Sequence, residues 1–392
     1  MVKEYSKNKR LVAILEYLLA LCFIINCNSI YYQWMPLGYF WIFTIIILLL
    51  LIYFERKDNM FSIFLGIIII ISFWVFPLII DIINGPISTF VSTFLGFVPL
   101  LLLYYKIVDD KTSLLLKYST LISILSLYSF ILWLFCSVLE IIPMNELFFN
   151  KWGDIGFVPS FNYIYFETQQ NVFFGNEIAR NSAIFTEAPM YAVNLLFALC
   201  LEVYIRKKIK VLYIISLLLG VISSTSATAY IVTILILLFQ RRIIIRSAFL
   251  KIVLFLTLGS VSGLAIINIT KDKKENNANS YDQRTGIMEK NFEDFCESPL
   301  FGKGFLSESS GNSNSIMCIL AEIGVWGALP FIYGLLLKPL LLYRKEECRN
   351  VSLAWLMSFL GYCVSVITYC FVPIALIAYM LSYNEKSSNL TE

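Results

Sequence analysis

Apolar runs of about 20 residues, the length that spans a bilayer core as a helix, recur along almost the whole chain and limit most strongly what it can fold into. Hydrophobic residues make up 59% of the sequence and charged residues 15%, whereas soluble domains average about 25% charged residues. The ten-residue alternating segments that are typical of an outer-membrane barrel are absent from the sequence. The sequence therefore predicts an all-α, polytopic membrane protein.

Basic clusters follow many of the apolar runs and orient them across the membrane. If all of these clusters are cytoplasmic, the apolar stretch at 211–240 must cross an even number of times. We interpret it as two short or re-entrant helices hinged at SSTSATA (223–229), and the stretch at 351–383 likewise as two short helices. This topology has about twelve segments and both termini in the cytoplasm. The remaining predicted spans are 11–29, 37–54, 60–80, 88–105, 118–142, 188–205, 247–268 and 315–337.

Two long polar segments, 143–187 and 269–314, lie on the outer face in this topology, and loops of that length are functional or disordered. The first contains KWGDIGFVPSFNYIYF from Lys151, which has too many aromatic residues for a disordered tether. In the second, MEKNFEDFCESPLFGKGF from Met288 predicts an amphipathic helix ended by Pro299 and a Gly-rich turn. The predicted organisation is 1–142 (N-terminal transmembrane helices), 143–187 (first external loop), 188–268 (transmembrane helices with the kinked pair), 269–314 (second external loop) and 315–392 (C-terminal transmembrane helices and a short cytoplasmic tail).

The sequence contains no histidine, which excludes a His general base, a His metal site and a His-centred triad. Almost all of the nine cysteines lie inside predicted spans, which favours neither a disulfide framework nor a metal cluster. We therefore expect no metal, no cofactor and no nucleic-acid partner.

Arg180 and Glu187 stand at the entrance of the predicted span 188–205. Arg180 is either an interfacial residue that contacts lipid headgroups or an anion clamp, because a guanidinium binds phosphate in two-pronged fashion. Glu187 is either a first-turn acid favoured by the helix dipole or a general base or anchor for Arg180.

Other candidates lie further along the chain. Arg284, like Lys290 and Lys303, is either a solvated loop charge or part of a binding site. Glu322 falls inside the span 315–337, where ionisable residues are functional candidates or pair with a cation in the bundle. The small residues of SSTSATA either let two helices pack closely or face a substrate.

Taken in chain order, these elements form a pattern that resembles the O-antigen polymerase and O-antigen ligase superfamily, which includes capsule and exopolysaccharide repeat-unit polymerases. The resemblance covers roughly residues 175–335. The elements are RNSAIFTEAP from Arg180, SSTSATA from Ser223, Arg284 followed by PLFGKGF from Pro299, and SNSIMCILAEIGVWG from Ser313.

The resemblance implies a GT-C-like membrane glycosyltransferase with a metal-independent, inverting mechanism. Its substrate would be an oligosaccharide repeat unit on undecaprenyl diphosphate at the outer face of the plasma membrane. The growing glycan would leave its lipid diphosphate and join a sugar hydroxyl of the next unit. Implied partners are the lipid bilayer and the flippase and chain-length regulator of the same pathway.

The resemblance also implies roles for individual residues. Arg180 and Arg284 would stabilise the diphosphate leaving group from two sides, and Glu187 would accept the proton of the attacking hydroxyl. The implied substrate-binding residues are Ser226, Asn314, Ser313, Lys303 and Glu322, and the implied sugar-stacking aromatics are Trp152, Tyr163 and Tyr165.

Two departures favour the polymerase branch over the ligase branch. Ala227 stands where ligases have an arginine at the kink, and Ser313 stands where they have the histidine of a His-Asn pair. The alternatives are a ligase, a flippase or transporter of the same lipid-linked sugar, and a scaffold of the synthesis machinery. A flippase would carry charged residues deep along many helices, whereas here ionisable residues crowd two external loops.

Overall fold

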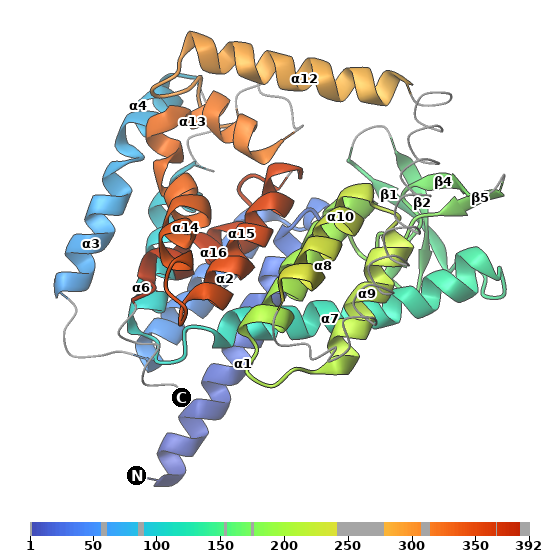
Figure 1. The fold of residues 1–392 in the computed structure, drawn as a ribbon, viewed down its shortest axis with the longest axis horizontal. Coiled ribbons are helices and arrows are strands. Elements are labelled where there is room, and N and C mark those ends of the chain that lie inside the picture. The colour runs from blue at the N-terminus through green and yellow to red at the C-terminus, as the bar shows by residue number, and fades with distance from the viewer. Residues whose placement is uncertain are drawn as a thin grey trace. The chain divides into compact units, whose positions relative to one another are not determined.

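In the computed structural model the chain folds into two compact units, each assembled from separate parts of the sequence (Figure 1). The first unit comprises Met1–Phe23, Met35–Lys117 and Arg284–Glu392, and the second comprises Ile24–Trp34 and Tyr118–Gln283. Most of the described residues are helical. The structure describes residues 2–55, 61–84, 90–152, 155–173, 176–240, 278–306, 314–365 and 367–384.

The first unit is a bundle of helices built around aromatic side chains. Phe371, at the start of α16, stacks on Phe97 with ring centroids 4.1 Å apart and also contacts Phe23, Phe40 and Trp41. Aromatic rings bury large apolar areas and prefer stacked or edge-on geometry, so this cluster ties the N-terminal helices to the C-terminal ones. The elements are α1 (Val2–Asn26), α2 (Leu37–Phe54), α3 (Phe61–Ser72), α4 (Val75–Asn84), η2 (Val91–Phe97), α6 (Val98–Ile107), α12 (Ala278–Glu297), α13 (Ser315–Ile332), η5 (Tyr333–Leu337), α14 (Lys338–Tyr343), α15 (Arg349–Cys363) and α16 (Phe371–Ser382).

The segment predicted as a single span at 60–80 is not one continuous helix, because α3 and α4 are separated by a turn at Phe73 and Trp74. Pro77 explains the break: it has no N–H with which to continue a helix onto the carbonyl of Phe73. Trp74 is buried at this turn, and its indole N–H donates to the carbonyl of Gly327 in α13 (3.1 Å).

The second unit surrounds one buried helix. In α8 (Ala188–Cys200) and the π-helical η4 that continues it (Leu201–Ile205), 89% of the residues are buried. Because this helix is buried on nearly all sides and is mostly apolar, with Asn194 and Glu202 as buried exceptions, it is a core helix rather than an amphipathic one. It packs against α9 (Val211–Ser224) and α10 (Ala227–Phe239). The other helical elements of this unit are η1 (Tyr31–Gln33), α7 (Ser113–Trp133) and η3 (Leu134–Val138).

The polar segment at 143–187, which the predicted topology places outside, folds as two small antiparallel sheets that the sequence did not predict. The first sheet pairs Phe148 with Val158 and Phe161 with Tyr165, and the second pairs Val172 with Glu177. These strands explain why the segment is rich in aromatic residues, because β-strands accommodate large rings on a half-buried surface. The strands are β1 (Glu146–Asn150), β2 (Gly156–Phe161), β3 (Tyr165–Phe166), β4 (Gln170–Phe173) and β5 (Asn176–Ala179).

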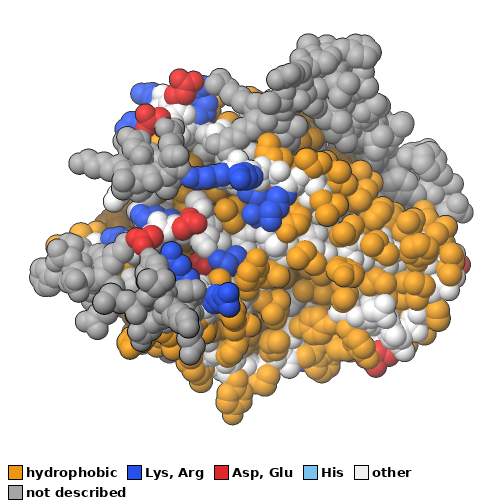
Figure 2. Space-filling view, turned by 90° about the horizontal axis from the view of Figure 1, so that it is seen from below, with side chains coloured by type: hydrophobic (Ala, Val, Ile, Leu, Met, Phe, Trp, Pro, Cys, Tyr) orange, Lys and Arg blue, Asp and Glu red, His pale blue; other side chains and the backbone are white. Residues whose placement is uncertain are grey.

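The helices fit a helical membrane protein. Among the described residues, 4 helices are long and apolar enough to cross a bilayer: Leu37–Phe54, Ser113–Val138, Ala188–Ile205 and Ser315–Tyr343. Hydrophobic side chains also cover much of the described surface on the face that Figure 2 shows. The stretches at 211–240 and 351–383 each form two short helices, as predicted. The predicted span at 247–268 lies outside the described residues.

Candidate functional site

The predicted kink at SSTSATA is present in the second unit between α9 and α10. Thr225 adopts the left-handed conformation (φ 49°, ψ 36°), which is an outlier for a β-branched residue. The hydroxyls of Ser223 and Ser224 donate to carbonyls three residues back, at 3.1 and 2.8 Å, as side chains do where a helix ends. Ser226 is then the N-cap residue of α10, with an extended backbone.

Arg180 docks onto this kink, so the structure brings together two elements that the sequence offered separately. Its Nε donates to the Ser224 carbonyl (3.1 Å) and to Thr225 Oγ1 (3.0 Å). Nη1 donates to Gln169 Oε1 (3.2 Å), and the side chain is half-buried. Three of the guanidinium contacts thus fix where the positive charge lies, immediately before the first turn of α10.

The residue after it, Asn181, was missed by the sequence reasoning. It is completely buried, and its Nδ2 donates to Ser223 Oγ (2.9 Å) and Ser129 Oγ (3.3 Å). Its backbone N–H donates to the Ser223 carbonyl (3.0 Å). Asn181 therefore attaches the Arg180 segment to the kink and to α7. In the sequence Asn181 stands between Arg180 and Ser182, and nothing there marked it as a buried residue.

Glu187 is the N-cap residue of α8, seven positions after Arg180 in the chain. Its carboxylate accepts a hydrogen bond from the Trp152 indole (2.9 Å) rather than capping the helix with its side chain. Asn150 donates to the Thr186 carbonyl (3.1 Å) beside it. These two hydrogen bonds therefore connect the residues at the end of β1 to the N-terminus of α8. Glu187 is half-buried there.

The aromatic candidates of the first loop occupy different environments. Tyr165 is completely buried, so the predicted stacking of its ring on a sugar is wrong for this conformation. Tyr163 is exposed at a turn, and its carbonyl accepts a hydrogen bond from the Tyr31 hydroxyl. Burial raises the pKa of Tyr165 well above its ordinary value, and Glu167 raises it further. This phenol therefore stays protonated and can donate a hydrogen bond.

In the first unit, PLFGKGF from Pro299 fits into a break in α13. The break lies at Gly324 (φ 64°, ψ −177°), where the helical bonds from Val325 to Ala321 and from Trp326 to Glu322 cannot form. The loop supplies replacement partners for these groups, which satisfies the requirement that buried backbone groups be hydrogen-bonded. The four replacement bonds are Lys303 N to Ala321 O (2.8 Å), Gly304 N to Glu322 O (3.0 Å), Val325 N to Pro299 O (2.9 Å) and Trp326 N to Leu300 O (3.0 Å).

Among the remaining predicted site residues, Lys303 lies in this loop, and Asn314 and Glu322 belong to α13. Lys303 forms an exposed ion pair with Glu297, which lowers the pKa of the Glu297 carboxyl and raises that of Lys303. Asn314 caps α13, where Oδ1 accepts from the N–H groups of Ile316 (3.0 Å) and Met317 (3.3 Å). Its side chain is thus committed to the helix. Glu322 is buried in α13 and interacts with Tyr369.

Arg284 lies in α12 and is the residue at which the last segment of the first unit begins. Ser313 lies outside the described residues. The side chain of Arg284 is likewise outside the described part of the structure. The two-sided clamp of Arg180 and Arg284 therefore stays a prediction. Comparison with protein families, curated proteins and solved structures finds no match to this chain.

Proposed function

We propose that this chain is a polymerase of lipid-linked oligosaccharide repeat units of the O-antigen, capsular or exopolysaccharide type. It transfers the growing glycan from undecaprenyl diphosphate to a sugar hydroxyl of the next unit at the outer face of the plasma membrane. The proposal includes a GT-C-like arrangement of about twelve membrane segments with both termini in the cytoplasm.

The docking of Arg180 beside the start of α10 carries this proposal. The first N–H groups of a helix have no partner within it and carry partial positive charge. Arg180 Nη2 lies 3.5 Å from the carbonyl of Thr225, two residues before α10 begins. A fixed guanidinium next to a helix N-terminus forms an anion site of the kind that binds phosphate. A lipid diphosphate presents that charge at the membrane surface.

The reaction needs this charge most at its transition state. The acceptor oxygen bonds to the anomeric carbon while the bond from that carbon to the diphosphate oxygen breaks. The electron pair of the broken bond stays on the diphosphate, and the proton of the acceptor hydroxyl passes to a base. Arg180 stabilises the leaving diphosphate because it is already in place. Glu187 is the proposed base, held in position by Trp152.

The experiment that tests this proposal is the glycan length profile on a gel, from a deletion strain carrying the wild-type gene or a variant. For Arg180→Ala we expect single repeat units in place of the long ladder, because losing one such stabilising group costs about 10²- to 10³-fold in rate. Arg180→Lys should also shorten the ladder, since Lys keeps the charge but cannot contact Thr225 and Gln169 at once.

Lys208→Ala is the matched control, because it removes one exposed positive charge from the same unit. Its ladder should equal that of the wild type at equal protein level. A full ladder from Arg180→Ala would remove the anion site from the mechanism. A full ladder from the deletion strain itself would refute the polymerase.

A further inference from the structure

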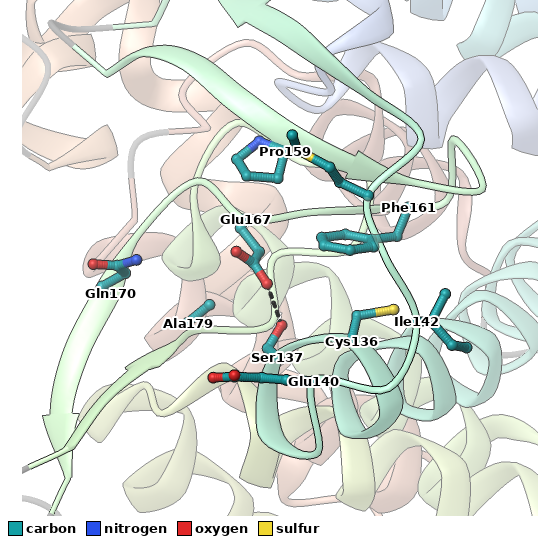
Figure 3. A pocket seen from close by; sticks show the side chains of 10 residues that line it. Cys136, Ser137, Glu140, Ile142, Pro159, Phe161, Glu167, Gln170 and Ala179 are labelled. Atoms are coloured by element: carbon teal, nitrogen blue, oxygen red, sulfur yellow. Dashed lines mark hydrogen bonds between the residues drawn. The ribbon is translucent and has the colours of Figure 1, made fainter.

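A pocket of about 320 Å³ lies in the second unit, between η3 with the residues that follow it and the strands β2, β4 and β5 (Figure 3). This volume is within the range of small-ligand sites, roughly 300–1,000 Å³. Its polar lining includes Ser137, Glu140, Glu167 and Gln170, and Phe161 forms part of its apolar wall. None of these residues belongs to the anion site at Arg180.

Glu167 is held in the pocket by a directed chain of hydrogen bonds. Ser137 Oγ donates to Glu167 Oε1. Because a serine hydroxyl has only one hydrogen, the Tyr165 hydroxyl must donate to Ser137 Oγ (2.6 Å). Such a chain polarises each member in turn. In Figure 3 the carboxylate of Glu167 lies above Ser137, and its second oxygen points away from Ser137. That oxygen is therefore oriented to accept from a ligand.

The charges of the lining select the class of ligand. Two carboxylates, an amide and a hydroxyl line the pocket, and the described lining residues include neither Lys nor Arg. Carboxylates accept hydrogen bonds from hydroxyl groups and repel phosphates and sugar acids. Calcium needs 6–8 oxygen ligands, and the described residues contain no group of three or more acidic or metal-binding side chains suited to a metal. The lining thus favours a neutral, hydroxyl-rich ligand.

The pocket and the anion site share one strip of backbone. Gln170 and Ala179 line the pocket, and their chain neighbours Gln169 and Arg180 hydrogen-bond to each other through main chain (2.8 Å) and side chain (3.2 Å). Successive residues of an extended chain point to opposite sides. The pocket therefore lies on one side of this strip and the guanidinium on the other.

We propose that this pocket binds a neutral sugar residue, with Glu167 accepting hydrogen bonds from its hydroxyl groups and Phe161 contacting its apolar side. That this sugar belongs to the acceptor unit rests on the proposed polymerase function. The assignment separates two chemistries: a positive site for the lipid diphosphate and a negative, hydroxyl-binding site for the sugar beside it.

Saturation-transfer NMR on the purified full-length protein in detergent tests the proposal, with glucose, N-acetylglucosamine and glucuronic acid as probes. We expect saturable binding of at least one of the two neutral sugars, and weaker binding of glucuronic acid. Glu167→Gln keeps the shape and still accepts from Ser137, but should weaken neutral-sugar binding about tenfold, because a hydrogen bond to a charged group is lost.

Glu146→Gln is the matched control, since Glu146 is exposed in β1 and does not line the pocket. It should bind as the wild type does. If Glu167→Gln fails to fold, Glu140→Gln replaces it, with an expected loss of about threefold; Glu140 is exposed, two residues after the end of η3. Three results would overturn the proposal. They are a wild type that binds neither neutral sugar, a pocket variant that binds as tightly as the wild type, and a wild type that binds glucuronic acid more tightly than the neutral sugars.

The binding measurement needs no glycan synthesis, so the two proposals fail separately. A full ladder in the deletion strain with Glu167-dependent sugar binding refutes the polymerase and supports the sugar pocket. A lost ladder in Arg180→Ala with unchanged binding in Glu167→Gln supports the polymerase and refutes the pocket.

Discussion

Replacing Gly302 with alanine should disrupt the connection between PLFGKGF and the break in α13. Gly302 has a φ of +78°, and a Cβ on it would lie 2.2 Å from the Glu322 carbonyl oxygen and 2.5 Å from Ile323 N. Both neighbours are backbone atoms, which cannot rotate away as a flexible side chain does. The loop must therefore move away from α13.

The expected cost follows from the bonds at this junction. Four backbone hydrogen bonds join the loop to α13, and each contributes about 1 kcal/mol net. Alanine in the left-handed region adds about 1 kcal/mol. If the shift breaks two to four of the bonds, Gly302→Ala destabilises the first unit by about 3–5 kcal/mol. Gly324→Ala should behave alike, because its φ and ψ lie in a region that essentially only glycine adopts.

Thermal unfolding read by a thiol-reactive fluorescent dye measures this effect, since most of the nine cysteines are buried until the protein unfolds. Gly286→Ala is the control: Gly286 lies exposed in α12, and no atom lies within 4 Å of the position that an alanine Cβ would occupy, so alanine should be neutral or slightly stabilising. An unfolding temperature of Gly302→Ala equal to that of Gly286→Ala would refute the argument.

Two further predictions concern topology and buried charge. A cysteine placed at the exposed turn residue Asn162, in a Cys296→Ser background, should react with an impermeant thiol reagent in intact cells, whereas one at Lys208 should not; the opposite labelling would invert the topology. Arg206→Ala should destabilise the protein by about 3–5 kcal/mol, because it leaves the fully buried Glu202 without its two-pronged partner. Restoration of part of that loss by Glu202→Gln, in the same unfolding assay, checks the cause.

The candidate site shows which functional features local sequence patterns can predict and which they cannot. Arg180 and the kink were each chosen from residue type and position, and the structure joins them directly. The pocket around Glu167 was not predicted. Its walls come from η3, from the residues that follow it, and from strands whose pairing no short sequence window contains. Glu167 itself stands among aromatic and amide residues, where nothing marks it as different from a surface acid.

The sequence alone determined the helical membrane class, the hinge at 223–229 and the amphipathic helix ended by Pro299, because each depends on hydropathy or backbone preference within a short window. Tertiary structure decided where Arg180 points, which backbone groups fill the break at Gly324, and that Tyr165 is buried. These outcomes depend on contacts between residues far apart in the chain. Each buried polar group must find a hydrogen-bond partner, and the packing of distant segments decides which partner lies close enough.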